Sequence, residues 1–261
     1  MIHPRIIPCL LLRGRGFVKT KDFRNPVYLG DPINIVRIFN EKEVDEIVIL
    51  DIEATVQGKI PAFDFLQEIA TECFVPLAYG GGIRNIDDAK TLFRTGFEKI
   101  CINTIAMENP SVISEFADHF GSQSVVVSID VRKGWSGRYQ VFTRSGTKGT
   151  GLDPVEAACM AVENGAGEIL LTSIDRDGTF QGYDLDLVRR VTTAINVPVI
   201  ACGGAGKASD LINVIRRANA AAAAAGSLFV FHGPHRAVLI NTPSHEEIYK
   251  LLLEDNQREK L

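Results

Sequence analysis

Eight strand-length apolar runs, each followed by an amphipathic stretch, are the feature that most constrains the fold of this chain. The runs are apolar almost without interruption, which is typical of parallel strands buried on both faces. Eight strand–helix units in 261 residues predict an α/β protein with one closed (β/α)8 barrel, a TIM barrel, rather than an open sheet. The expected strands cover residues 6–11, 46–51, 75–79, 99–102, 124–130, 168–173, 197–202 and 221–225.

One segment departs from this alternation. Residues 138–151, "RYQVFTRSGTKGTG", are too polar for a helix that packs on a barrel, and their apolar residues follow a β pattern. They predict a β-ribbon inserted after the fifth strand.

An internal repeat divides the predicted barrel into two halves. "DEIVILDIEAT" (residues 45–55) parallels "GEILLTSIDRDGT" (residues 167–179), and "VPLAYGGGI" (75–83) parallels "VPVIACGGAG" (197–206). The offset of about 120 residues is half a typical barrel. We therefore expect one domain over residues 1–261, with half-barrels at about 1–121 and 122–261. In this register Leu11 is the partner of Asp130.

Composition excludes several classes of function. The chain is 46% hydrophobic and 23% charged, as in ordinary globular proteins, and its net charge of −4 gives no nucleic-acid footprint. No apolar run has the length of a membrane span, and no signal peptide is recognisable. The five cysteines show no CxxC spacing and the five histidines no metal-ligand spacing. We expect a cytoplasmic protein with free thiols that binds no metal, cofactor, nucleic acid or membrane.

Two glycine clusters indicate binding of phosphate groups. Residues 80–82 and 203–204 each follow a strand and precede a helix, where backbone N–H groups approach an anion closely. Residues 103–104 and 226–227 close the neighbouring strands in the same way. Glycines that only turn the chain are the alternative. Because the two clusters occupy equivalent places in the repeat, they favour a phosphorylated small molecule with two phosphates.

Carboxylates end several predicted strands at the face where barrel enzymes place their catalytic groups. Asp130 ends the fifth strand, while Asp51, Asp175 and Asp177 follow the second and sixth. From their positions we expect Asp130 and Asp177 to take part in catalysis, and the other aspartates to hold loops. Acid–base chemistry on a sugar phosphate needs two titratable groups that face each other. The position that faces Asp130 is Leu11.

Four ionisable residues mark the opposite end of the barrel. They start the first, second, fourth and sixth strands and alternate in sign. Solvated strand ends are the default interpretation of any one of them. Together they predict a charged ring around the barrel axis, a gate in a pore: Arg5, Glu46, Lys99 and Glu168.

The motifs "GEILLTSIDRDGT", "GGGI", "INT", "GSQSVVVSID" and "GGAGK" resemble the cyclase subunit (HisF) family of imidazole glycerol phosphate synthase over nearly the full length. The resemblance implies a barrel that works with a separate glutaminase (HisH-like) at its N-terminal face. Ammonia from that partner would cross the barrel to a phosphoribulosyl-formimino aminoimidazole carboxamide ribotide, here called the formimino substrate. Imidazole glycerol phosphate and an aminoimidazole carboxamide ribotide would be released.

The resemblance also assigns residues by position. The four ring residues match the ammonia gate of the family, and Asp130 matches one of its two catalytic aspartates. The implied substrate and phosphate ligands are Lys19, Asp51, Gly82, Asn103, Thr104, Asp177, Gly178, Gly204, Gly226 and Ser227.

The second catalytic aspartate of the family falls on Leu11, and the following loop, "LLRGRGFVKT", replaces an acidic Asp-Gly turn. Loss of an acid–base group costs about 10²–10⁴ in rate. The combination resembles paralogues that accompany sugar amidotransferases in surface-polysaccharide (lipopolysaccharide) biosynthesis. There the barrel and its glutaminase supply ammonia to a third protein, which converts a sugar N-acetyl group into an acetamidino group.

Two other functions stay open. One is a working cyclase of histidine biosynthesis that replaces the missing acid with another carboxylate, and the other is a non-catalytic phosphate-binding scaffold. The isomerase of the related barrel is disfavoured, because it also needs two aspartates and uses no ammonia. The chain has no cysteine in a Gly-x-Cys-x-Gly elbow, so its glutaminase is expected to be a separate protein, docked near Arg5 and Glu98.

Overall fold

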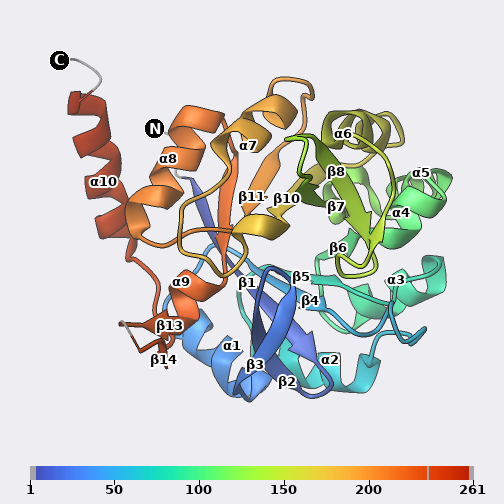
Figure 1. Ribbon diagram of the computed structural model, residues 1–261. Helices are drawn as coiled ribbons and strands as arrows, with labels where there is room; N and C mark the ends of the chain where they lie inside the picture. Colours follow the sequence, from blue (N-terminus) through green and yellow to red (C-terminus); the bar gives the residue numbers. More distant parts are fainter. Residues whose placement is uncertain (1–3, 234, 259–261) are drawn as a thin grey trace.

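A closed barrel of parallel strands forms the centre of the molecule. The computed structural model describes residues 4–233 and 235–258. Within these ranges eight parallel strands each pair with the next, and the last pairs with the first (Figure 1). The (β/α)8 prediction is therefore confirmed. The strands, in order around the barrel, are β1 (Arg5–Arg13), β4 (Ile47–Asp51), β5 (Leu77–Gly80), β6 (Lys99–Ile102), β7 (Val125–Lys133), β10 (Glu168–Ser173), β11 (Val199–Cys202) and β12 (Ala222–Ala225).

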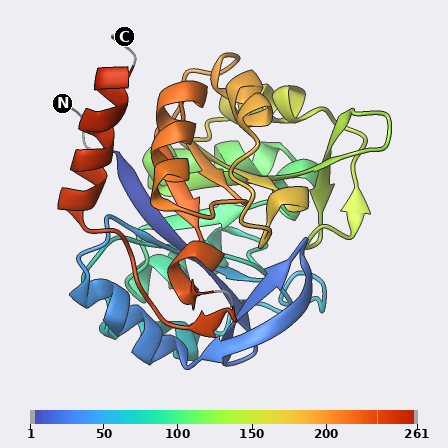
Figure 2. The ribbon, with the colours of Figure 1, turned by 60° about the vertical axis from the view of Figure 1, so that its left-hand side comes forward.

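Helices follow the strands and surround the barrel (Figure 2). Two of them start at an aspartate before a proline: the Asp31 carboxylate accepts from Asn34 N at 3.0 Å, and that of Asp153 from Val155 N at 2.8 Å. No described helix is long and apolar enough to cross a membrane. The helices are α1 (Pro32–Glu41), α2 (Phe63–Thr71), α3 (Ile86–Arg94), α4 (Thr104–Glu108), α5 (Ser111–Phe120), α6 (Pro154–Glu163), α7 (Leu185–Thr192), α8 (Ala208–Ala218), α9 (Ser227–Val230) and α10 (His245–Arg258), with 3-10 turns η1 (Ser122–Ser124) and η2 (Ile174–Arg176).

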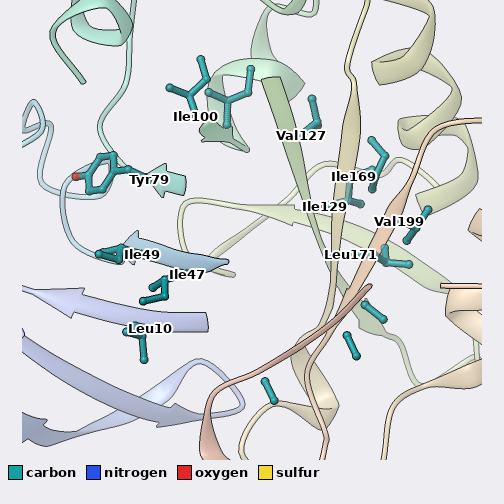
Figure 3. Packing of buried hydrophobic residues seen from close by; sticks show 14 of the residues in the cluster. Leu10, Ile47, Ile49, Tyr79, Ile100, Val127, Ile129, Ile169, Leu171 and Val199 are labelled. Carbon is teal, nitrogen blue, oxygen red and sulfur yellow. The ribbon is translucent and has the colours of Figure 1, made fainter. Parts of the chain in front are cut away.

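The strands are buried on both faces, which explains their continuous apolar runs. Successive side chains alternate, so Ile47 and Ile49 pack under the helices while Val48 points into the barrel. Figure 3 shows the outer layer, with Leu10, Ile47, Ile49, Tyr79, Ile100, Val127, Ile129, Ile169, Leu171 and Val199 labelled. The inner layer is made of smaller residues: Ile7, Cys9, Val48, Ala78, Cys101, Val126, Leu170, Ile200, Ala222 and Ala224.

Two antiparallel ribbons extend the barrel at the C-terminal ends of its strands. β2 (Gly16–Lys21) and β3 (Arg24–Gly30) continue from β1, whereas β8 (Tyr139–Thr143) and β9 (Lys148–Gly149) continue from β7. β8 and β9 lie within residues 138–151. The ribbon after β1 was not predicted from the sequence. A small pair, β13 (Phe231–His232) and β14 (Ala237–Val238), precedes α10.

The two ribbons meet above the barrel. β1 and β7 are opposite each other in the eight-strand order, so their ribbons approach from opposite sides. A methyl group placed on Gly146 would lie 2.9 Å from Cδ2 of Phe23. Ser145 Oγ also donates to the carbonyl oxygen of Ile52 at 2.7 Å. The ribbons therefore cover the C-terminal mouth of the barrel.

Candidate functional site: one cavity and one ion-pair ring

A cavity of about 360 Å³ opens at the C-terminal ends of the strands, under the two ribbons. Leu11 and Asp130 both line it. Phe23 of one ribbon and Ser145 of the other complete the walls. Other lining residues include Thr20, Leu50, Asp51, Ile52, Asn103, Thr104, Ser128 and Thr147.

Asp130 is a carboxylic acid whose pKa lies near neutral pH. Its side chain is buried, and that burial raises its pKa from 3.8 to about 7. The negative charge of Asp177 raises it further, while hydrogen bonds from Ser128 and Thr172 oppose the shift. A carboxyl group with this pKa exchanges protons readily at neutral pH. Leu11 shares its cavity but offers no proton.

Replacing Asp130 by asparagine should stabilise the fold above neutral pH and change little in acid. Because the folded-state pKa is raised to about 7, the stability linked to this group is present at low pH and is lost as the pH rises through about 7. We expect a gain of about 2–4 kcal/mol at about pH 8 that vanishes near about pH 4. Urea unfolding at both pH values measures it, and an equal change at both would contradict the assignment.

A second, small cavity of about 40 Å³ adjoins the first. Here Lys19 Nζ lies 2.5 Å from Asp177 Oδ1, and Thr20 Oγ1 donates to Asp177 Oδ2 at 2.8 Å. Asp177 is thus held in a buried ion pair. Ser227 also lines this cavity, and its hydroxyl is buried with no hydrogen-bond partner among the described residues. Gly178, Gly204 and Gly226 complete the lining.

A third cavity of about 280 Å³ lies at the equivalent place of the other half. Gly82, Asn103 and Thr104 line it, but the two side chains already serve the fold. Asn103 Nδ2 donates to the carbonyl oxygens of Ser128 and Phe142, and Thr104 Oγ1 accepts from the backbone N–H of Arg144. An anion needs hydrogen-bond donors, and Asn103 Nδ2 already donates to these two carbonyl oxygens.

Three basic residues of this cavity were missed by the sequence interpretation. Lys59, Arg84 and Arg144 line it together with Gly82. Each is a single basic residue in a loop, without motif or spacing, so no sequence signal distinguished it from a solvated surface charge. Glu108 also lines the cavity and pairs with Arg144 at 3.4 Å. Three basic residues against one acid leave the lining net positive, which suits an anionic group.

The glycines are required by the packing of the loops, whether or not a ligand binds. Gly82 has φ +72° and Gly204 has φ +110°, a conformation that other residues rarely adopt. A Cβ atom on Gly204 would lie 2.2 Å from the carbonyl oxygen of Gly182. Gly226 has a milder conflict, 3.0 Å from the carbonyl oxygen of Cys9. These glycines are therefore needed to turn the chain, and this role is compatible with anion binding.

Asp51 has a structural role in the loop after β4. Its Oδ1 atom accepts from the backbone N–H groups of Glu53 and Ala54, each at 2.9 Å. Burial raises its pKa, and these two donors oppose the shift. The side chain still lines the main cavity.

At the N-terminal end of the barrel the four charged residues form a closed ring. Glu46 Oε2 accepts from Arg5 Nη1 at 2.9 Å and from Lys99 Nζ at 2.8 Å. Glu168 binds the same two cations: its Oε2 lies 3.0 Å from Lys99 Nζ, and its Oε1 accepts from Arg5 Nη2. They are not independent solvated strand ends, because Glu46 and Glu168 are buried.

The ring holds its cations in the charged form. Burial alone would lower the pKa values of Arg5 and Lys99, but the hydrogen bonds and charges of Glu168 and Glu46 outweigh it and raise both. Above the ring, the inner layer is apolar and Cys101 is buried. That burial raises the pKa of the Cys101 thiol well above its usual value, so it is uncharged. The interior between the ring and the main cavity therefore favours neutral species.

Comparison with known proteins places the chain in a family. The sequence profile of the family "Histidine biosynthesis protein" matches residues 5–235. Relatives named "Putative imidazole glycerol phosphate synthase subunit" are 53% identical in Pseudomonas aeruginosa, covering 93% of this chain and 97% of the relative, and 49% identical in Leptospira interrogans, covering 95% and 98%. An imidazole glycerol phosphate synthase subunit HisF of Metallosphaera sedula is 48% identical, covering 88% and 91%. The chain therefore belongs to the histidine biosynthesis protein family, among the HisF cyclase subunits of imidazole glycerol phosphate synthase.

Proposed function

We propose that this chain is the ammonia-conducting barrel subunit of a glutamine amidotransferase complex and that its own ring-closing activity is impaired. The main support for the proposal is the contrast between the two ends of the barrel. One end holds a complete ion-pair ring, and the other holds Asp130 with a leucine where a second acid is needed. An apolar, uncharged interior joins them.

A glutaminase subunit docked at the N-terminal face is the proposed source of ammonia. Arg5, the most exposed member of the ring at 32% of its side-chain surface, gives access from that side. Phe74 precedes β5 on the same face and is 84% exposed. A large exposed apolar side chain at this end of the barrel supports a protein partner there.

The proposal also names an acceptor for the ammonia. Leu11 removes the second acid–base group, so the ammonia is proposed to serve a third protein, a sugar amidotransferase that makes an acetamidino sugar of a surface polysaccharide. The resemblance to paralogues of that pathway supports this acceptor. A phosphorylated ligand in the cavities around Gly82 and Gly204 would then regulate or anchor the complex.

Histidine biosynthesis is the second candidate. The pKa of about 7 for Asp130 suits general acid–base catalysis, and the HisF relative of Metallosphaera sedula supports a cyclase. In that case another carboxylate replaces the missing aspartate. A scaffold that binds phosphate without chemistry is the third, supported by the two glycine-lined cavities. Of the three functions, only the scaffold would not need the ion-pair ring.

The test is reconstitution of the complex from this chain, a glutaminase subunit and the sugar amidotransferase of the same organism. We expect this chain and the glutaminase to co-purify. We expect formation of the acetamidino sugar driven by glutamine to fall about tenfold or more in Lys99→Ala and Glu46→Ala, while that driven by ammonium salt persists, because added ammonia does not need to pass the ring. Lys148→Ala, a change in an exposed ion pair with Glu108, is the control. No association with the glutaminase, or unchanged glutamine-driven activity in both ring variants, would contradict the conduit.

A further inference from the structure

The two glycine-lined cavities occupy equivalent places in the repeat, but they differ in size. The one lined by Gly82, here called the larger glycine cavity, has a volume of about 280 Å³. The one lined by Gly204, the smaller glycine cavity, has a volume of about 40 Å³. Because one water molecule needs about 10–15 Å³ of such space, the smaller cavity has room for about three waters. A phosphate group, with its four oxygens, needs more.

The side chain of Lys19 accounts for the small volume. It is buried, and its Nζ atom lies 2.5 Å from Asp177 Oδ1. A Cβ atom placed on Gly226 would lie 3.1 Å from Lys19 Cε. The lysine side chain therefore packs against the glycine backbone that a second phosphate would have to approach.

The ribbon of β2 and β3 holds Lys19 in this place. Asp22 N donates to the carbonyl oxygen of Asp177 at 3.0 Å, and Thr20 Oγ1 donates to Asp177 Oδ2 at 2.8 Å. A Cβ atom placed on Gly178 would lie 2.5 Å from the carbonyl oxygen of Thr20. The residues on both sides of Lys19 are thus fastened to the loop after β10.

The two cavities also differ in charge. Lys19 and Asp177 are the charged residues among the described residues that line the smaller glycine cavity, and their charges cancel. The larger glycine cavity has three basic residues against Glu108. A phosphate that entered the smaller cavity would draw Lys19 away from Asp177 and leave a buried carboxylate beside an anion. Breaking a buried ion pair in this way corresponds to a loss of about 10²-fold or more in affinity.

An apolar wall lies between the main cavity and the smaller glycine cavity. Leu11, Phe23 and Leu50 line both of them. On its other side the main cavity shares Asn103 and Thr104 with the larger glycine cavity. A ligand with its phosphate in the larger glycine cavity would extend into the main cavity and meet apolar side chains at its far end.

We infer that this chain binds a phosphomonoester with one phosphate, held in the larger glycine cavity, and that the ion pair of Lys19 and Asp177 closes the smaller glycine cavity to a second phosphate. Leu11 then belongs to the wall that faces the uncharged end of the ligand. The inference narrows the ligand of the proposed function to one phosphate, and it rests on that function only for what the bound ligand does. Closure lowers the affinity for a second phosphate and is separate from the loss of proton transfer at Leu11.

Titration calorimetry of the chain alone tests the inference with two sugars that differ by one phosphate, ribulose 5-phosphate and ribulose 1,5-bisphosphate. We expect the monophosphate to bind and the bisphosphate to bind no more than about threefold more tightly. A larger preference for the bisphosphate, or no binding of the monophosphate, would overturn the inference.

Two double variants separate the charge of the ion pair from the space that Lys19 fills. Lys19→Ala with Asp177→Asn removes both, so the bisphosphate should bind about tenfold or more tightly than the monophosphate, through hydrogen bonds to its second phosphate. Lys19→Met with Asp177→Asn removes the charges but keeps the length of the side chain, and should show no such preference. The same preference in both variants, or in neither, would contradict closure by the Lys19 side chain.

Lys59→Ala tests which cavity holds the phosphate. Lys59 lines the larger glycine cavity, so its loss should weaken binding of both sugars equally, by about tenfold. Arg37→Ala, a change in an exposed ion pair with Glu72, is the control and should leave both affinities unchanged. Unchanged binding in Lys59→Ala would contradict the larger glycine cavity as the phosphate site.

These titrations are independent of the proposed complex, because they need no glutaminase. A one-phosphate site in a chain that binds no glutaminase would retain the inference and reject the conduit. A clear preference for the bisphosphate in a chain that does conduct ammonia would reject the inference and retain the conduit.

Discussion

Replacing Leu11 by aspartate should raise ammonia-driven turnover of the formimino substrate by about 10²–10⁴-fold over the unmodified chain. Leu11 and Asp130 line the same cavity from strands on opposite sides of the barrel. The variant would restore a second proton-transferring group facing Asp130, whose pKa of about 7 already suits this chemistry. Turnover is measured with the purified variant and a saturating ammonium salt, so that no glutaminase is needed.

Leu50→Asp is the matched control for this experiment. Leu50 is the register partner of Leu11 on the neighbouring strand and lines the same cavity. The control therefore adds the same charge to the same space, but not at the position opposite Asp130. Equal activity in both variants would show that position 11 is not special, and no activity in Leu11→Asp would show that the altered loop after β1 also prevents ring closure.

Lys99→Met should lower the free energy of unfolding by about 3 kcal/mol, near the lower end of the range for breaking a buried ion pair. The change leaves two buried carboxylates, those of Glu46 and Glu168, with Arg5 as their one remaining partner in the ring. Because Lys99 keeps 18% of its side-chain surface exposed, solvent moderates the loss. Urea unfolding at neutral pH measures it.

Lys148→Met is the matched control for the stability of Lys99→Met. Lys148 pairs with Glu108 at 3.2 Å, and both side chains are exposed. Exposed pairs contribute about 0–1 kcal/mol, so this variant should unfold almost like the unmodified chain. Similar losses in both variants would mean that the ring is no stronger than a surface ion pair.

The sequence predicted the barrel well because its strands carry an unusually direct signal. Strands buried on both faces must be apolar at successive positions. The internal repeat separately predicted that Leu11 lies opposite Asp130. β12 consists of four alanines, of which Ala222 and Ala224 belong to the inner layer.

Other parts of the site could not be predicted. Residues 16–30 form the ribbon of β2 and β3, but glycines and basic residues at the start of this segment gave it the appearance of a loop. The interactions of Asn103 with the carbonyl oxygens of Ser128 and Phe142 depend on how the second ribbon folds back. The closure of the charged ring was anticipated from strand positions. That Glu46 Oε1 has no hydrogen-bond partner among the described residues depends on side-chain geometry, which sequence patterns do not carry.

Ammonia-driven turnover of the formimino substrate by the unmodified chain tests most directly whether Leu11 impairs ring closure. With purified protein and an ammonium salt, we expect turnover at least about 10²-fold below that of a HisF subunit with both aspartates. Turnover equal to that of such a subunit would show that another group replaces the acid missing at Leu11, and it would make this chain a working cyclase of histidine biosynthesis.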